Sequence, residues 1–280
     1  MIDAYAGRLP DPVLNFGGRP MNAFSLALTA TCFTFLCTAA GAAFVFVVGH
    51  SRKKTVVQVS LGFAAGIMLA ASVFGLLIPS IDGARAAGGG LVPPAGGFVL
   101  GVLLLMLMNR LVPHLHTDAD EPEGVRSGLG RQSLLFLAIT IHNVPEGMAL
   151  GVLAAAAGGS VPEGMGALLA LAIGIGIQNI PEGTAVSVPL FAAGGTRKKS
   201  FLLGVLSGAV EPAGALLVVC FQDLVVALLP WFLSFSAGAM LYVVVEELIP
   251  EASLGEHSHT GTLSVMLGFL VMMVLDVALG

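Results

Sequence analysis

Long apolar runs are the feature of this sequence that most limits how the chain can fold. A helix that crosses a bilayer needs about 20 consecutive apolar residues. Only 10% of the residues are charged, against about 25% in soluble domains. The sequence therefore predicts an all-α polytopic membrane protein with eight transmembrane helices. The runs lie near residues 24–49, 56–80, 94–112, 132–157, 162–192, 200–229, 231–252 and 262–279.

The basic residues predict how these helices are oriented. Nine of the twelve lie in odd-numbered loops, which must share one side of the membrane: Arg52, Lys53, Lys54, Arg110, Arg126, Arg131, Arg197, Lys198 and Lys199. Positive charge favours the cytoplasmic side. We therefore expect extracytoplasmic termini, an extracytoplasmic segment 1–22, one transmembrane domain over 23–280 and a cytoplasmic loop over about 113–131. A multi-pass protein of a bacterial inner (plasma) membrane fits this arrangement.

One short motif occurs twice, in the fourth and fifth runs. His142-Asn143-Val144-Pro145-Glu146-Gly147 recurs 36 residues later as Gln178-Asn179-Ile180-Pro181-Glu182-Gly183. Because consecutive spans run antiparallel, the two copies face each other in opposite directions near the middle of the membrane. Transporters with a site on a pseudo-two-fold axis have this arrangement.

Carboxylates inside the last five runs lack basic partners. They include Glu146, Glu182, Glu211, Glu246, Glu247 and Asp276, and no Lys or Arg lies within the same runs. A charge at the bilayer centre costs about 2.5–3.5 kcal/mol on insertion scales, so protonation or a bound cation must neutralise these groups. His142 and Glu146 lie one turn apart on one helix face. Imidazole, carboxylate and amide ligands favour zinc, iron or a similar metal over calcium or magnesium. Because a carboxylate can bridge two ions, the sequence is also compatible with a binuclear site.

Prolines next to three of these acids indicate kinked helices. Pro145, Pro181 and Pro212 lack the N–H that would bond the carbonyl four residues earlier. A membrane tolerates freed backbone carbonyls only where protein or a water-filled cavity satisfies them. The prolines therefore predict a polar path through the bundle.

The sequence leaves the roles of several other polar residues less defined. Glu246 and Glu247 either line an exit or reach the headgroup region, and Asp276 is expected to be solvated or to cap the last helix. The histidines and acids of 113–121 and 256–259 either capture metal or form a solvated acidic surface. Cys32, Cys37 and Cys220 are expected to be small buried side chains.

The paired motif resembles that of the ZIP family of metal transporters, in particular its GufA-like branch, which has Gln in the second copy. Residues 62–72, 207–212 and 237–240 are similar to the family as well. The resemblance implies eight helices in a 3+2+3 bundle whose central pair carries the metal. It implies that Met68, His142, Glu146, Gln178 and Glu182 bind one ion. Asn143, Asn179 and Glu211 would then contribute to a second ion that shares Glu146 and Glu182.

The expected function is movement of a divalent metal towards the cytoplasm by alternating access, with an elevator-like slide in some family members. Zinc is the first choice, and cadmium, iron, manganese and cobalt fit the same ligands. We expect no enzymatic activity and no cofactor other than the transported ion. A homodimer is left open, and the net charge of −5 argues against a nucleic-acid partner.

Two other classes of protein fit the sequence less well. An intramembrane metalloprotease would need an H-E-x-x-H arrangement, which the sequence lacks. A proton- or sodium-coupled carrier of an organic solute could use the same acids, although His142 and the paired amides argue for metal.

Overall fold

The computed structural model describes residues 21–47, 53–114, 124–158, 164–252 and 259–279, and regular structure in these ranges is helical. Eight helical stretches in this part of the chain are long and apolar enough to cross a membrane. The predicted all-α polytopic fold with eight spans is therefore confirmed. The N-terminal segment up to residue 20 and loop residues 115–123, including His116, lie outside the described residues, as does His257.

The first three spans are built from six helical elements. The first is α1 (Ala23–Ala42) with the short 3₁₀ segment η2 (Ala43–Phe46). The second is α2 (Lys53–Ala70), the π-helical segment η4 (Ala71–Leu77) and α3 (Ile78–Ala86). The third is α4 (Val92–Leu111).

The remaining five spans follow in sequence order. α5 (Arg131–Gly158) and α6 (Gly164–Ala192) are the fourth and fifth. The sixth is α7 (Arg197–Ser207) and α8 (Val210–Val219), and the short α9 (Gln222–Ala227) follows it. The seventh is α10 (Leu229–Val243), the π-helical η5 (Val244–Leu248) and α11 (Ile249–Ala252). α12 (His259–Leu279) is the eighth.

Two predicted boundaries are wrong. The second run is predicted to end near residue 80, but Asp82–Arg85 is helical as well, and Arg85 Nη1 lies 3.6 Å from Asp82 Oδ1 one turn away. The chain turns later, at Gly88 and Gly90, whose φ angles of 72° and 60° suit glycine. The sixth span ends at Val219 rather than near 229, because α9 forms a separate helix.

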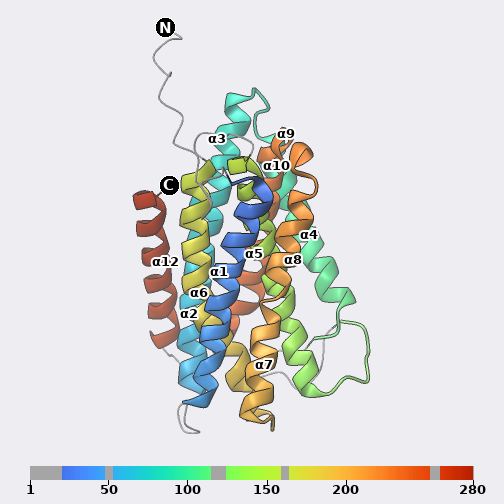
Figure 1. Ribbon diagram of the computed structural model, residues 1–280, viewed down its shortest axis with the longest axis vertical. Coiled ribbons are helices and arrows are strands. Elements are labelled where there is room, and N and C mark those ends of the chain that lie inside the picture. The colour runs from blue at the N-terminus through green and yellow to red at the C-terminus, as the bar shows by residue number, and fades with distance from the viewer. Residues whose placement is uncertain (1–20, 48–52, 115–123, 159–163, 253–258, 280) are drawn as a thin grey trace.

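The two motif-bearing helices occupy the middle of the bundle (Figure 1). α6 packs on α1 and α2, and α5 packs on α8 and α10. At the flanks, α2 packs on α12 and α4 packs on α10. The central pair of the expected 3+2+3 bundle is thus present, while α4 joins the bundle through α10, and α12 joins it through α2 and α6.

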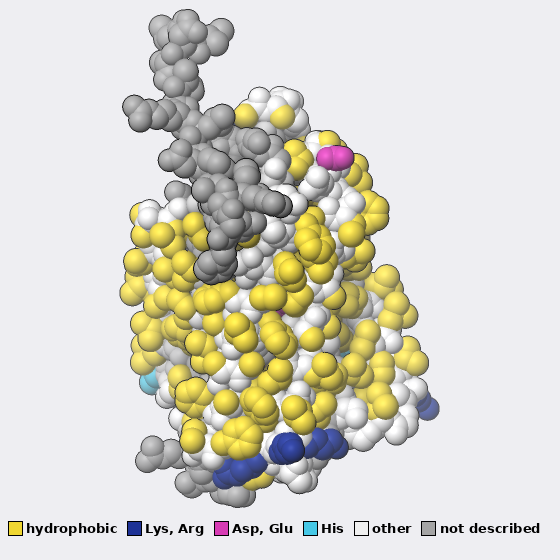
Figure 2. Space-filling view, in the orientation of Figure 1, with side chains coloured by type: hydrophobic (Ala, Val, Ile, Leu, Met, Phe, Trp, Pro, Cys, Tyr) yellow, Lys and Arg dark blue, Asp and Glu magenta, His cyan; other side chains and the backbone are white. Residues whose placement is uncertain are grey.

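The surface fits a lipid environment. Hydrophobic side chains cover the sides of the bundle in Figure 2, and Lys and Arg gather at the end where α7 begins. α1 begins and α12 ends at the opposite end (Figure 1). Cys32 and Cys220 are exposed rather than buried, because an apolar residue of a membrane bundle can face lipid as well as the core.

Candidate metal centre

The two copies of the motif meet in the core between α5 and α6. α5 supplies His142, Asn143 and Glu146, and α6 supplies Gln178, Asn179 and Glu182. Their side chains are buried, Glu146, Gln178 and Asn179 completely so. Glu211, in the first turn of α8, is also completely buried. The fold therefore brings together seven of the eight predicted site residues from helices four, five and six.

Hydrogen bonds connect the motifs to each other and to the neighbouring helices. Gln178 Nε2 donates to Glu146 Oε1 over 2.6 Å, which joins α6 to α5. Asn179 Nδ2 donates to Glu211 Oε1 over 2.8 Å. Asn143 Nδ2 donates to the carbonyl of Ser207 over 3.1 Å. The three amide nitrogens are thus used within the protein, which leaves each amide oxygen as the remaining polar atom of its side chain.

The centre contains acceptors without donors. Five buried side-chain oxygens of the two motifs have no hydrogen-bond partner among the described residues: Asn143 Oδ1, Glu146 Oε2, Gln178 Oε1, Asn179 Oδ1 and Glu182 Oε2. An unmatched buried acceptor costs about 1–3 kcal/mol. The carboxylates of Glu146, Glu182 and Glu211 also interact electrostatically with one another. An arrangement of oxygen acceptors and mutually repelling acids suits a multivalent cation.

Met68 is the eighth predicted residue and lies on another helix. Its side chain is completely buried on α2, which packs on α6, but no described hydrogen bond connects it to the motifs. In the described part of the chain, no three His, Cys, Asp or Glu side chains are grouped as a metal site. A cation at this centre would therefore take amide or thioether ligands as well.

Glu247 is a partner of His142 that sequence reasoning left undecided. Glu247 is 2% exposed, and its Oε2 contacts His142 Nε2. Its other oxygen accepts from Asn109 Nδ2 on α4 over 3.2 Å. Glu246, in contrast, is exposed and lines a cavity of about 350 Å³ with Asn109 and Tyr242. The structure thus separates the two neighbouring acids, of which only Glu247 reaches the motif.

Two threonines of α1 belong to the centre and were not predicted. Thr34 Oγ1 donates to Glu211 Oε2, and Thr38 Oγ1, which donates to the Thr34 carbonyl over 3.2 Å, lies 3.5 Å from Glu211 Oε1. Both are buried, as is Thr31 on the same helix. Hydroxyls at positions 31, 34 and 38 follow the i, i+3, i+7 spacing of one helix face, which is the signal that could have shown them.

Contacts around the two motifs follow an inverted repeat. Asn143 donates to the carbonyl of Ser207, and Asn179 donates to the carbonyl of Thr34 over 3.2 Å. A Cβ on Gly147 would lie 2.3 Å from the carbonyl oxygen of Glu211, and one on Gly183 would lie 2.2 Å from that of Thr38. The repeat therefore extends to the flanking spans one and six.

A sequence signature supports this extension. T-x-x-x-T-x-x-G over 34–41 corresponds to S-x-x-x-E-x-x-G over 207–214. At this register Thr38 is the counterpart of Glu211, and Thr34 is the counterpart of Ser207.

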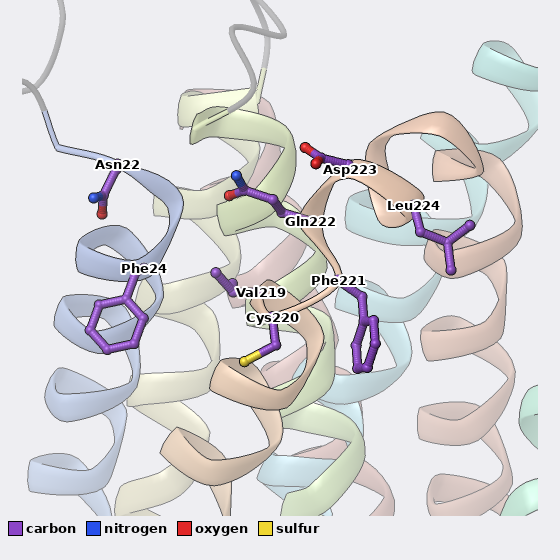
Figure 3. Close-up of a pocket in the computed structure, with 8 residues that line it drawn as sticks. All are labelled: Asn22, Phe24, Val219, Cys220, Phe221, Gln222, Asp223 and Leu224. Carbon is purple, nitrogen blue, oxygen red and sulfur yellow. The ribbon is translucent and has the colours of Figure 1, made fainter.

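The other polar residues considered in the sequence lie away from the centre. Asp276 is half-buried near the end of α12. His114 is buried and its Nδ1 contacts the carbonyl of Val112 over 2.9 Å. A separate cavity of about 530 Å³ lies between the start of α1 and the α8–α9 connection, where Asn22, Gln222 and Asp223 line it (Figure 3). None of the predicted site residues lines this cavity.

Comparison with known proteins places the chain in a family. Residues 116–276 match the family model described as ZIP Zinc transporter. The chain belongs to the ZIP family. It is 37% identical to the human protein named Zinc transporter ZIP11, over 91% of this chain and 97% of the relative. It is 39% identical to Zinc transporter GufA of Myxococcus xanthus, over 90% and 98%, and 40% identical to Zinc transporter ZIPB of Bordetella bronchiseptica, over 79% and 71%.

Proposed function

We propose that this ZIP family member carries a divalent transition-metal cation, zinc in the first place, across the membrane towards the cytoplasm. The observation that carries the proposal is the group of five buried motif oxygens between α5 and α6, which have no hydrogen-bond donor in the part of the chain that the structure describes. The relatives are named zinc transporters, and the donor types suit zinc, cadmium, iron, manganese and cobalt alike. Transport of this kind needs residues that bind and release an ion. It needs no catalytic residue.

The proposed first ion is bound by Met68, His142, Glu146, Gln178 and Glu182. Gln178 fits this role because its Nε2 is used by Glu146 and its Oε1 is unpartnered. His142 fits because its Nε2 contacts Glu247. A neutral imidazole that donates through Nε2 keeps its lone pair on Nδ1, and a carboxylate on the other ring nitrogen is the usual support of a metal-binding histidine.

The proposed second position would use Asn143 and Asn179, with Glu146 and Glu182 shared and Glu211 nearby. Both asparagines have an unpartnered Oδ1, which favours their participation. Both oxygens of Glu211 accept hydrogen bonds, but a carboxylate has about four lone-pair sites. Glu211 therefore remains a proposed ligand of this second position.

Alternating access is the proposed mechanism of transport. The helix break between Ser207 and Val210 lies directly before Glu211. The π-helical segments η4 and η5 interrupt spans two and seven, and η5 contains Glu247. Irregular backbone at membrane depth is typical of helices that line a transport path.

Metal flux into proteoliposomes tests the proposal. Wild type is compared with Glu146→Gln/Glu182→Gln for Zn²⁺, Cd²⁺, Fe²⁺, Mn²⁺, Co²⁺, Mg²⁺ and Ca²⁺, and the exposed Glu246→Gln is the matched control. We expect saturable entry of the transition metals, at least tenfold slower entry with the double variant, and nearly unchanged entry with the control. Equal flux through wild type and the double variant would refute the site.

A further inference from the structure

We propose that the start of α7 binds the headgroup of an anionic phospholipid, with an acyl chain of that lipid lying along the outer face of the helix. The surface is separate from the candidate metal centre, so the inference stands independently of the proposed function. Three observations carry it: the positive charge in the first turn of α7, the contacts that fix this turn, and a row of exposed apolar side chains further along the helix.

The first turn of α7 contains three basic residues in succession and no acid. Arg197, Lys198 and Lys199 begin the helix, and the two lysines are exposed. The N-terminal end of a helix carries the positive end of the helix dipole, so cations are unfavourable there and anions are favourable. Figure 2 shows Lys and Arg gathered at this end, and no Asp or Glu among the described residues on the face shown there. The turn therefore favours an anionic group beside it.

Arg197 fixes the first turn of α7 against the rest of the bundle. Its Nη1 donates to the Val45 carbonyl over 2.7 Å and to the Phe46 carbonyl, both in η2. Its guanidinium lies 5.0 Å from the centroid of the Phe191 ring near the end of α6. Successive helix residues point about 100° apart. Because Arg197 faces η2 and α6, the two lysines that follow it extend from the exposed side of a well-held turn.

A row of exposed apolar side chains continues from Lys198 along α7. Leu202 and Leu206 follow four and eight residues later, and each is 54% exposed, which is the spacing of one helix face. Phe201 packs beside this row on Phe46 of η2, with ring centroids 5.3 Å apart. The row spans about 12 Å, close to the roughly 15 Å of hydrocarbon in one leaflet. Positive charge at the end of an apolar row of this length fits a phospholipid better than a soluble anion.

Other exposed basic residues lack this combination. Arg85 lies 3.6 Å from the carboxylate of Asp82, and Arg110 lines its cavity together with Glu246. Each therefore has an acid close by. Lys198 makes no ion pair within the described part of the chain. Its ammonium group is thus the one that the phosphate of a lipid would reach first.

Native mass spectrometry of the purified full-length protein tests the proposal. Dioleoyl phosphatidylglycerol and dioleoyl phosphatidylcholine are titrated separately into the protein in detergent, and the lipids bound per chain are counted. We expect wild type to bind phosphatidylglycerol at least fivefold more tightly than phosphatidylcholine. Because one lysine beside anionic lipid changes the affinity about fivefold, Lys198→Gln/Lys199→Gln should bind phosphatidylglycerol at least fivefold more weakly than wild type.

A charge-matched control separates this site from a general effect of net charge. Arg126 is exposed in the stretch before α5, which begins at the same end of the bundle as α7 (Figure 1). Arg126→Gln should therefore bind phosphatidylglycerol as wild type does, whereas Lys198→Gln should bind it about fivefold more weakly. Lys198→Arg keeps the charge and should retain the wild-type affinity. If the double variant does not fold, the single variants at position 198 give the same comparison.

Glycerol phosphate distinguishes a lipid from a soluble phosphate, because it has the anionic group without acyl chains. It should not displace phosphatidylglycerol at equal concentration, and displacement would overturn the assignment to a lipid. Equal binding of the two phospholipids by wild type would overturn the proposal. Unchanged binding of phosphatidylglycerol by the double lysine variant, or an equal loss with Arg126→Gln, would overturn it as well.

Discussion

At the scale of single residues, the centre depends on which atom of each amide side chain is hydrogen-bonded within the protein. Gln178 and Asn143 donate through nitrogen to an acid and to a backbone carbonyl. These acceptors fix the orientation of the amides and leave only oxygens for a cation. An amide side chain in such a setting acts as an uncharged carboxylate substitute, which lowers the repulsion among the acids.

The motif residues could be predicted from the sequence because a repeated pattern of acids and amides in apolar helices is rare. Their partners could not be. Glu247, Thr34 and Asn109 come from spans seven, one and three, and no local rule says which face of a distant helix will pack on the motif. The spacing of the threonines on α1 is visible in the sequence, but the same spacing is common in helices that only pack against a neighbour.

Glu247→Gln is expected to weaken transport without unfolding the protein. The variant removes the charge that orients His142, and loss of such a supporting carboxylate typically costs about 10–100-fold in metal affinity or activity. Initial rates of Zn²⁺ uptake against concentration should show a raised KM. Glu246→Gln, at the adjacent exposed position, should retain the wild-type KM, and an equal effect of both variants would contradict the assignment.

At the scale of elements, apolar run length predicted the spans, but glycine contacts determine how they pair. A Cβ on Gly66 of α2 would lie 2.0 Å from the Val265 carbonyl of α12, and one on Gly238 of α10 would lie 2.2 Å from the Phe98 carbonyl of α4. Each glycine precedes a buried methionine by two residues, Met68 and Met240. This G-x-M-L pattern over 66–69 and 238–241 is a further trace of the repeat. The break before Val210 lies beside Pro212, where the sequence predicts a kink. The two π segments could not be predicted, since propensity does not encode them.

Gly183→Ala is expected to destabilise the protein, since the new Cβ would lie 2.2 Å from the backbone oxygen of Thr38. Two helix backbones would have to separate, and overpacking of this kind costs about 1–3 kcal/mol. Thermal unfolding in detergent should show a clearly lower Tm, with reduced Zn²⁺ flux. Gly128→Ala, at a position with open space around it, is the control. An unchanged Tm for Gly183→Ala would mean that α1 and α6 are not held at this distance.

At the scale of the whole molecule, charge and hydropathy predicted the number of spans and the clustering of basic residues at one end. Figure 2 shows this cluster at the end where α7 begins. The orientation relative to the cytoplasm stays a prediction from the positive-inside rule. The three-dimensional order of the spans could not be predicted, because spans far apart in sequence, such as α2 and α12, become neighbours.

Labelling of single cysteines from outside the cell tests the orientation. In a background without Cys32, Cys37 and Cys220, Asp223→Cys on α9 should react with a membrane-impermeant maleimide in intact cells. Lys198→Cys on α7 should react only after permeabilisation. Both positions are exposed, and α7 begins at the end of the bundle opposite to α9 (Figure 1). The reverse labelling pattern would place the basic end outside.

The contacts around the glycines also have a mechanical consequence. Backbone contacts and the hydrogen bonds of the centre connect α1, α5, α6, α7 and α8 into one body. The glycines of α2 and α10 connect these helices to α12 and α4 instead. Among the interhelical hydrogen bonds described above, only the one between His142 and Glu247 joins the two bodies. A shear between them would therefore release His142 from its acid while the oxygens of both motifs and Glu211 travelled together.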